Sequence, residues 1–238
     1  MQSEEVSKFC NYPISIHKDA VSSIRDTVDE AMDYSIYTMS LKLAGDTEID
    51  KLQASASFLN ITINDLPGAL RKGKLSYNKH YNETVMVSIS KDILFDFYKS
   101  SKTEFEVMCF CAYAATRSIL GKKPYMKITN DFFIARMFGF GSIRDMPAQF
   151  KNRSIYKEYT KRYTLDKIKK ELTDSWGLKL YGRYTRGFYI SYTMGYETLV
   201  LYAEKNRKVY KNKVIKAEKE AVLLRVLAKL ELENTSTA

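Results

Sequence analysis

Proline and glycine are scarce in this 238-residue sequence, which has four Pro and ten Gly. Sandwiches and barrels need many turns that consume both residue types, so the scarcity favours long helices. No apolar run reaches the roughly 20 residues that span a bilayer. The first residues, MQSEEVSKFC, also lack the apolar core of a signal peptide. We therefore expect a cytoplasmic protein with no membrane partner.

Cysteine and histidine are too few and too scattered for the usual metal motifs. The three cysteines cannot all pair within the chain, and Cys109 and Cys111 lie in an apolar stretch. We expect them to be small buried side chains in a reducing compartment. His17 and His80 have no Cys, His or Asp companion at ligand spacing. The sequence therefore predicts no metal site.

Patterns that would indicate catalysis are equally weak. Asp92 and Asp96 share a face of a predicted helix, but no third ligand lies nearby, which favours a solvated face. The Gly-Phe-Gly at 139–141 is too short for a dinucleotide or phosphate loop. We expect no catalytic residue and no cofactor, and hence a protein that is not an enzyme.

Positive charge is concentrated in one part of the chain. Hydrophobic residues make up 45% and charged residues 28%, an ordinary globular composition, and the formal net charge is +10. Between Lys151 and Ile190 there are eleven Lys/Arg and four Asp/Glu, a net charge of +7. Such a cluster attracts polyanions, because phosphate contacts supply much of the affinity of a nucleic-acid binder. Charge alone does not separate DNA from RNA or acidic lipid.

The N-terminal part has helical periodicity. A helix over about 18–43 is predicted by apolar residues at three- and four-residue steps, namely Val21, Ile24, Val28, Met32, Ile36 and Met39. A second helix is predicted over 47–59, with Asp46 or Thr47 as its cap. The stretch 60–82 is rich in Asn, Gly and Lys and contains Pro-Gly, which indicates a linker or irregular connection.

The middle of the chain alternates between strand and helix signals. ETVMVSIS predicts a short strand at 84–89. Ser90 can cap a helix through about Lys99, and Thr103 can cap a second helix that Gly121 ends. Apolar residues surround this second helix almost completely, so we expect it to be the central core helix of its domain.

A third group of signals follows. KPYMKIT (123–129) predicts a strand, and Asn130 a cap for the helix DFFIARMFGF. Thr164 can cap LDKIKKELTDSW, and Gly177 stands where a left-handed glycine ends a helix. One narrow buried stripe is predicted for Leu165, Ile168, Leu172 and Trp176. We expect Trp176 to be largely buried where this helix meets the next element.

That element is a predicted β-hairpin. Two alternating runs flank a short turn, Thr185-Arg186-Gly187. The side chains expected to point inward are Leu178, Leu180, Phe188, Ile190 and Tyr192.

The order of helices 103–120, 130–139 and 164–176 and hairpin 178–193 resembles the winged helix-turn-helix DNA-binding superfamily. The most similar stretch is TLDKIKKELTDSWGLKLYGRYTRGFYISY. The run EFEVMCFCAYAATRSILGKKPYMKITNDFFIARMFGF is similar in layout to plasmid-type replication initiators and to DNA-binding proteins of phages and bacterial mobile elements. The segment 140–163 departs from the pattern: either it is an insertion, or the third helix is misassigned.

The resemblance implies a recognition helix in the major groove and a wing that contacts the backbone. Lys167 and Lys170 face away from the buried stripe, and Arg183 and Arg186 flank the hairpin tip. The predicted DNA-binding residues are Arg153, Lys157, Lys161, Arg162, Tyr163, Thr164, Lys167, Lys170, Arg183 and Arg186. Arg153 and Lys157 represent an alternative, in which 140–163 covers the helix or itself contacts DNA.

The C-terminal segment, from Tyr196 to about Glu233, predicts one long helix. Its middle mixes charges densely, and its end gathers the apolar residues Val222, Leu223, Leu224, Val226, Leu227 and Leu230. Docking onto the N-terminal helices is the simpler expectation for this apolar end, and self-association or binding of another protein is the alternative.

Together these signals predict a mostly α, α+β fold with three parts. Residues 1–82 form an N-terminal helical region and linker, 83–195 a winged-helix domain, and 196–238 a C-terminal helix. The expected function is double-stranded DNA binding in replication initiation or transcription regulation, as in a phage or mobile element.

Three alternatives to this function remain. The cations can be an ordinary solvated surface. The eighteen tyrosines can stack on RNA or single-stranded bases, although no ribonucleoprotein-type motif supports this. The chain can also be a structural component of a phage particle that uses a winged-helix-like domain for subunit contacts.

Overall fold

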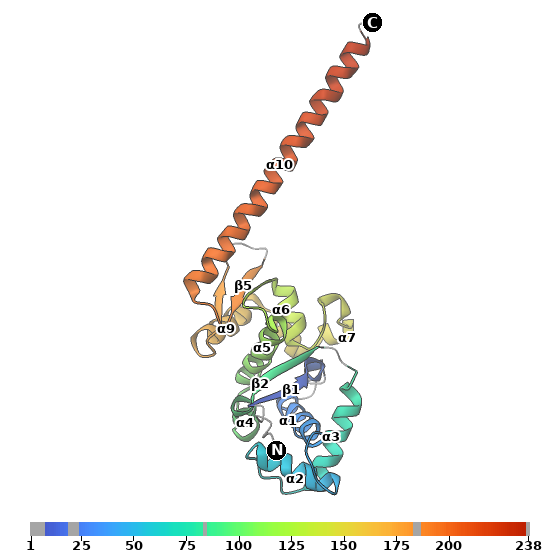
Figure 1. The fold of residues 1–238 in the computed structure, drawn as a ribbon, viewed down its shortest axis with the longest axis vertical. Helices are drawn as coiled ribbons and strands as arrows, with labels where there is room; N and C mark the ends of the chain where they lie inside the picture. The colour runs from blue at the N-terminus through green and yellow to red at the C-terminus, as the bar shows by residue number, and fades with distance from the viewer. Residues whose placement is uncertain (1–7, 19–23, 83–84, 183–186, 237–238) are drawn as a thin grey trace.

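Helices make up most of the fold, and two small antiparallel sheets complete it within the residues that the structure describes (Figure 1). This computed structural model describes residues 8–18, 24–82, 85–182 and 187–236. The expected mostly α, α+β class and the long C-terminal helix are confirmed.

The first half contains β1 (Phe9–Pro13), the 3₁₀ helix η1 (Ile14–Lys18), α1 (Ile24–Ser40), α2 (Glu48–Phe58), α3 (Leu66–His80), β2 (Met86–Ser90), α4 (Lys91–Lys99) and α5 (Glu104–Leu120). The second half contains β3 (Met126–Ile128), α6 (Asn130–Met137), η2 (Ile143–Asp145), α7 (Ala148–Lys151), α8 (Ser154–Tyr159), α9 (Arg162–Asp174), β4 (Lys179–Tyr181), β5 (Phe188–Ser191) and α10 (Tyr196–Ser236).

Strand β1 pairs with β2, and this pairing crosses the predicted boundary between residues 82 and 83. The register places Cys10 opposite Ile89 and Tyr12 opposite Val87. All of these side chains are buried, because residues two apart on a strand share a face. The two predicted parts therefore share a sheet and one continuous hydrophobic core.

The expectation of a linker at 60–82 was wrong, because α3 occupies most of it. Asp65 caps this helix by accepting a hydrogen bond from the Gly68 amide at 3.0 Å, and Pro67 lies in the first turn, where its missing N–H costs nothing. At Gly73, an added Cβ would lie 2.6 Å from the Tyr37 Cβ of α1. The Pro and Gly residues that suggested a linker therefore start the helix and allow it to pack closely.

Helix α5 is the buried central helix that the sequence predicts. Thr103 and Glu106 form a capping box, with Thr103 Oγ1 donating to the Glu106 carboxylate at 2.7 Å. The free thiols of Cys109 and Cys111 are buried, as expected. Burial raises the pKa of the Cys109 thiol to about 12, which keeps it in the unreactive protonated form.

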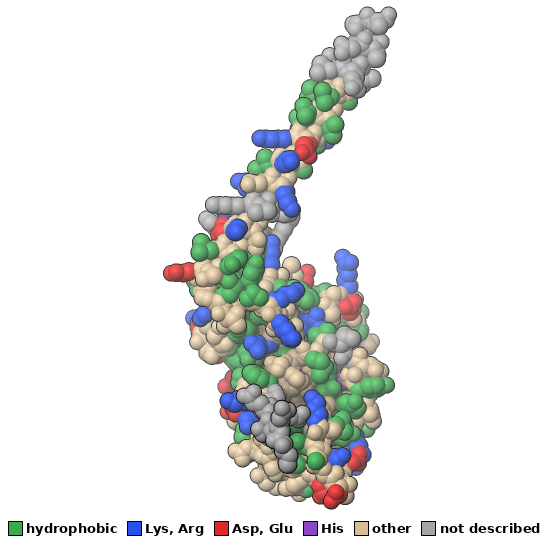
Figure 2. Space-filling model, viewed as in Figure 1, with side chains coloured by type: hydrophobic (Ala, Val, Ile, Leu, Met, Phe, Trp, Pro, Cys, Tyr) green, Lys and Arg blue, Asp and Glu red, His purple; other side chains and the backbone are tan. Residues whose placement is uncertain are grey.

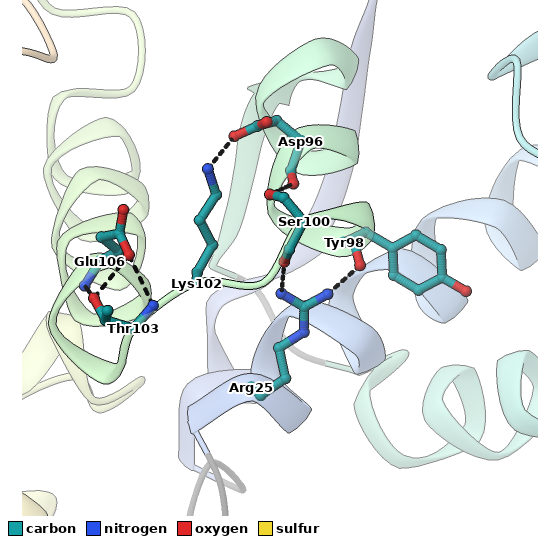
Figure 3. A network of polar contacts seen from close by, with 7 residues as sticks. All are labelled: Arg25, Asp96, Tyr98, Ser100, Lys102, Thr103 and Glu106. Atoms are coloured by element: carbon teal, nitrogen blue, oxygen red, sulfur yellow. Dashed lines mark hydrogen bonds and ion pairs between the residues drawn. The ribbon is translucent and has the colours of Figure 1, made fainter.

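A polar network joins α1 to the end of α4 (Figure 3). The Arg25 guanidinium donates to the backbone carbonyl of Ser100 at 2.8 Å and to that of Tyr98. Carbonyls at a helix C-terminus have no partner within the helix, so these bonds satisfy them. Lys102 forms an ion pair with Asp96 at 2.8 Å. This network fixes the turn into α5.

The second sheet has the order β3-β5-β4 and contains the predicted hairpin. Ile190 pairs with Met126 on one side and with Leu180 on the other. The predicted cap of α6 is corrected by one residue, because Thr129 Oγ1, rather than Asn130, accepts the Phe132 amide at 3.2 Å. Residues 183–186, the predicted wing tip, lie outside the described residues.

Helix α9 begins before its predicted start. Its N-cap is Lys161, and Thr164 is a buried residue within the helix that donates to Glu158 at 3.3 Å. The expectation that Thr164 caps the helix was therefore wrong. Gly177 has φ +72°, the left-handed conformation expected at the end of this helix.

The buried stripe of α9 is confirmed for Leu165, Ile168 and Leu172. Trp176 is only partly buried, and its ring lies 4.7 Å from that of Tyr113 and 5.6 Å from that of Phe97 (centroid distances). Its ring therefore packs against α4 and α5, and the expectation that it is largely buried was wrong.

Helix α10 extends away from the rest of the molecule (Figure 1). Only its foot is packed, where Leu199 and Ala203 are buried. The apolar residues near its far end, Val222, Leu223, Leu224, Val226 and Leu227, are 47–67% exposed. The expectation that they dock onto the N-terminal helices was wrong.

His17 joins η1 to α6 within the core. Its Nδ1 donates to the Met137 carbonyl at 3.0 Å, so in the neutral ring Nε2 accepts from the Tyr12 hydroxyl at 3.3 Å. Gly139 lies at the same junction with φ +82°, and an added Cβ there would lie 2.7 Å from the Ile14 carbonyl oxygen. Burial lowers the pKa of His17 to about 4, since no carboxylate compensates a charged ring.

The free energy of unfolding should fall as the pH drops from about 6.5 to about 4. The unfolded chain takes up a proton on His17 near pH 6.5 and the folded chain only near pH 4, so acid favours unfolding over this window. The contribution is roughly 3 kcal/mol. Urea titrations at both pH values should show that His17→Gln loses this part of the acid sensitivity. Equal sensitivity in the variant would contradict a neutral buried His17.

Trp176→Ala should lower the free energy of unfolding by about 3 kcal/mol, since it removes a large ring stacked on two others. This loss is at the lower end of the range for replacing a buried tryptophan by alanine, because the Trp176 side chain is only partly buried. Denaturant unfolding measures the change, and a loss below about 1 kcal/mol would show that the ring packs loosely.

Candidate nucleic-acid interface

The predicted site residues that the structure describes gather on α8, α9 and the turn between them. Exposed side chains there are Lys157, Lys161, Arg162, Tyr163, Lys167 and Lys170, and we call this set the α9 face. The elements contact one another, and α9 in turn packs on α5. The contact between α8 and α9 therefore brings Lys157 into the same part of the fold as the cations of α9.

The outer side of α9 is set by its helical spacing. Tyr163, Lys167 and Lys170 recur at four- and three-residue steps, opposite the buried stripe that packs on α5. Tyr163 is 70% exposed, and the Lys167 ammonium lies 4.6 Å from its ring centroid. This contact orients both side chains on the surface. An aromatic ring and two lysines thus lie side by side facing solvent.

The segment 140–163 forms its own small cluster and leaves the α9 face open. Phe150 is buried between the rings of Phe138 and Phe140, with centroid distances of 5.5 and 5.0 Å. Tyr156 lies 5.5 Å from Phe138. A helix, α9, is present where the third helix was predicted, and η2, α7 and α8 lie between it and α6. The segment 140–163 does not cover this helix.

Two of the predicted residues are less exposed than the α9 face. Thr164 is buried and already bonded to Glu158. The Arg153 guanidinium lies 4.8 Å from the Phe150 ring centroid, and its Nη1 is buried with no hydrogen-bond partner among the described residues. Arg153 therefore packs against Phe150 of α7, whereas Lys157 of α8 is exposed.

Nearby carboxylates neutralise part of the charge. Lys161 donates to Glu158, and this hydrogen bond lowers the pKa of the Glu158 carboxyl. Arg162 lies 3.9 Å from Asp166. Within the described parts of the chain, no carboxylate lies at ion-pair distance from the three remaining lysines of the α9 face. These are Lys157, Lys167 and Lys170, which carry the uncompensated charge.

Lys169 has a structural role that the sequence did not predict. Its ammonium donates to Asn130 Oδ1 at 2.6 Å and lies 4.5 Å from the Phe188 ring centroid. Burial lowers the pKa of this lysine. Lys169 therefore joins α9 to α6 and β5, in contrast to its neighbours Lys167 and Lys170. The sequence places Lys169 at the edge of the buried stripe of α9, which is a weak signal for burial. Its partners Asn130 and Phe188 lie far from it in the sequence, so the contact could not be predicted.

The hairpin contributes less to the described site. Arg183 and Arg186 lie outside the described residues, so their predicted role stays a prediction. In strand β4, the Tyr181 hydroxyl donates to Glu204 of α10 at 2.8 Å and fixes the first turns of that helix. The hairpin thus lies between the α9 helix and α10.

In the described residues, no group of three or more His, Cys, Asp or Glu side chains could hold a metal ion. None of the helices in the same residues is long and apolar enough to cross a membrane. The chain matches no protein-family model, no curated protein and no solved structure.

Lys169→Ala should lower the free energy of unfolding by about 1–2 kcal/mol, because Asn130 loses its hydrogen bond and Phe188 its covering cation. Lys170→Ala, the matched control one residue on, should change it by less than about 0.5 kcal/mol because its side chain is exposed. Thermal or urea unfolding distinguishes them. Equal effects would contradict the separate roles assigned to these lysines.

Proposed function

We propose that this protein binds double-stranded DNA through the α9 face. The observation that carries the proposal is that the outer side of α9 is exposed and bears uncompensated lysines, while its inner side is fixed on the core. A helix held in this way can enter a major groove with its outer side chains against phosphates and base edges.

The order of elements supports a winged helix-turn-helix. Helices α5, α6 and α9 precede the hairpin β4–β5, as that fold requires, and β3 adds a third strand to the hairpin. The segment that carries α7 and α8 leaves this order intact. The pairing of β5 with both β3 and β4 supports the same proposal.

The start of α9 adds an electrostatic contribution. A helix N-terminus carries partial positive charge and unpaired N–H groups, which favour a phosphate. Lys161 and Arg162 lie at this end, and the exposed Lys157 precedes them. Glu171 and Asp174 lie further along, so we expect the strongest contacts near the N-terminal half of the helix.

Replication initiation or transcription regulation, in a phage or mobile element, remains the proposed process, and it rests on the similarity of layout alone. A structural role in a phage particle is the second candidate. The exposed apolar residues of α10 favour it, since an assembly protein needs surface for subunit contacts.

Electrophoretic mobility of a random duplex across a salt series tests the proposal. The native chain should shift the duplex at low salt and lose affinity steeply as salt rises, because bound phosphates release counterions. Lys167→Ala with Lys170→Ala should weaken binding about 10-fold or more and make the salt slope shallower. Lys42→Ala with Lys72→Ala, two exposed lysines outside the α9 face, is the matched control and should bind as the native chain does.

Two results would overturn the proposal in different ways. Absence of a shift at low salt excludes DNA binding by this chain. Native affinity in the Lys167/Lys170 double variant, with loss in Lys157→Ala, would exclude the outer side of α9 as the contact and place it on α8 instead.

A further inference from the structure

The far part of α10 is a helix without a partner. Its foot is held to the hairpin and β3, where Tyr181 bonds Glu204 at 2.8 Å and the rings of Tyr125 and Tyr202 lie 5.3 Å apart. From Lys211 to Ala228 every residue is exposed. Figure 2 shows hydrophobic side chains on this projecting part. Helices in water gain most of their stability from packing of an apolar face, so this segment needs a partner surface.

One side of this segment has the spacing of a coiled-coil seam. Residues at alternating three- and four-residue steps are Val214, Ala217, Ala221, Leu224 and Ala228, and none of them is charged. These are the a and d positions of a heptad repeat. Lys216 and Lys219 fall on the opposite side, as expected for the solvent face. The uncharged seam and the charged solvent face therefore lie on opposite sides of the helix.

The charges beside the seam are complementary to those of an identical helix. With Val214 at position a, Lys213 and Glu220 occupy g, and Glu218 and Arg225 occupy e. In a parallel pair, a g residue lies beside the e residue of the following heptad on the other helix. Lys213 then faces Glu218 of the second copy, and Glu220 faces Arg225 of the second copy. In each of these pairs, a positive side chain faces a negative one.

We infer that α10 joins two or more copies of this chain through a parallel coiled coil over residues 211–228. The exposed Val214 and Leu224 on the seam and the self-complementary charges beside it select a second copy as the occupant. Glu220 also contacts Lys216 of its own helix at 3.8 Å, but both side chains remain largely exposed, so Glu220 can reach across. Val222 and Val226 lie outside a two-helix seam and offer further copies a surface.

A parallel arrangement places the globular parts of the copies at the same end. Two α9 faces would then be presented together, as dimeric DNA-binding proteins present two recognition elements to two half-sites. Self-association holds whether or not the chain binds DNA, so its test uses the protein alone.

Sedimentation equilibrium of the full chain measures the association. The native protein should show a mass at least twice the 27.5 kDa of one chain. Glu220→Arg and Arg225→Glu should each raise the dissociation constant about 10-fold, because each turns attraction into repulsion on both sides of the seam. An equimolar mixture of the two variants should regain native association, since a mixed pair restores both ion pairs. Lys219→Glu, on the solvent face, is the control and should associate as the native chain does.

A single-chain mass at concentrations up to roughly 100 µM would overturn the inference. So would two weakened variants that fail to rescue each other when mixed, because in an antiparallel pair residues 220 and 225 do not face one another. Circular dichroism of each variant confirms that the helix content is unchanged before the masses are compared.

Discussion

The burial of α5 is the interaction on which the other elements depend. This helix contacts α1 and β2 on the N-terminal side and α6, α9 and β5 on the C-terminal side. Its fully buried residues, such as Phe110 and Ala114, allow close approach from all directions. Because α9 must bury its apolar stripe against α5, its opposite side has to face solvent. The candidate interface is thus a consequence of how the core is filled.

The same constraint separates lysines that are adjacent in sequence. Lys169 turns toward Asn130 and Phe188 and stabilises the packing of α9, whereas Lys167 and Lys170 remain available to a ligand. A count of positive charge cannot make this distinction. The positive charge that α9 presents to solvent therefore depends on which side of the helix each lysine occupies, and the packing of the core determines that side.

Local signals predicted much of the fold. The N-cap at Thr103, the left-handed Gly177 and the alternating hairpin strands each depend on neighbouring residues, and each is found as expected. Helix α3 was missed because Pro67 and Gly68 indicate a turn unless Asp65 is seen to cap a helix that begins there. The burial of Thr164 and the packing of Arg153 against Phe150 depend on how α7, α8 and α9 pack together, which no local pattern reveals.

Lysine footprinting with an acetylating reagent, with and without a random duplex, tests the central claim most directly. If duplex DNA covers the α9 face, Lys157, Lys167 and Lys170 should lose reactivity when DNA is added at low salt. Lys42 and Lys72, which are also exposed, should react equally in both samples. Protection of Lys42 or Lys72 with unchanged reactivity on α9 would contradict the account.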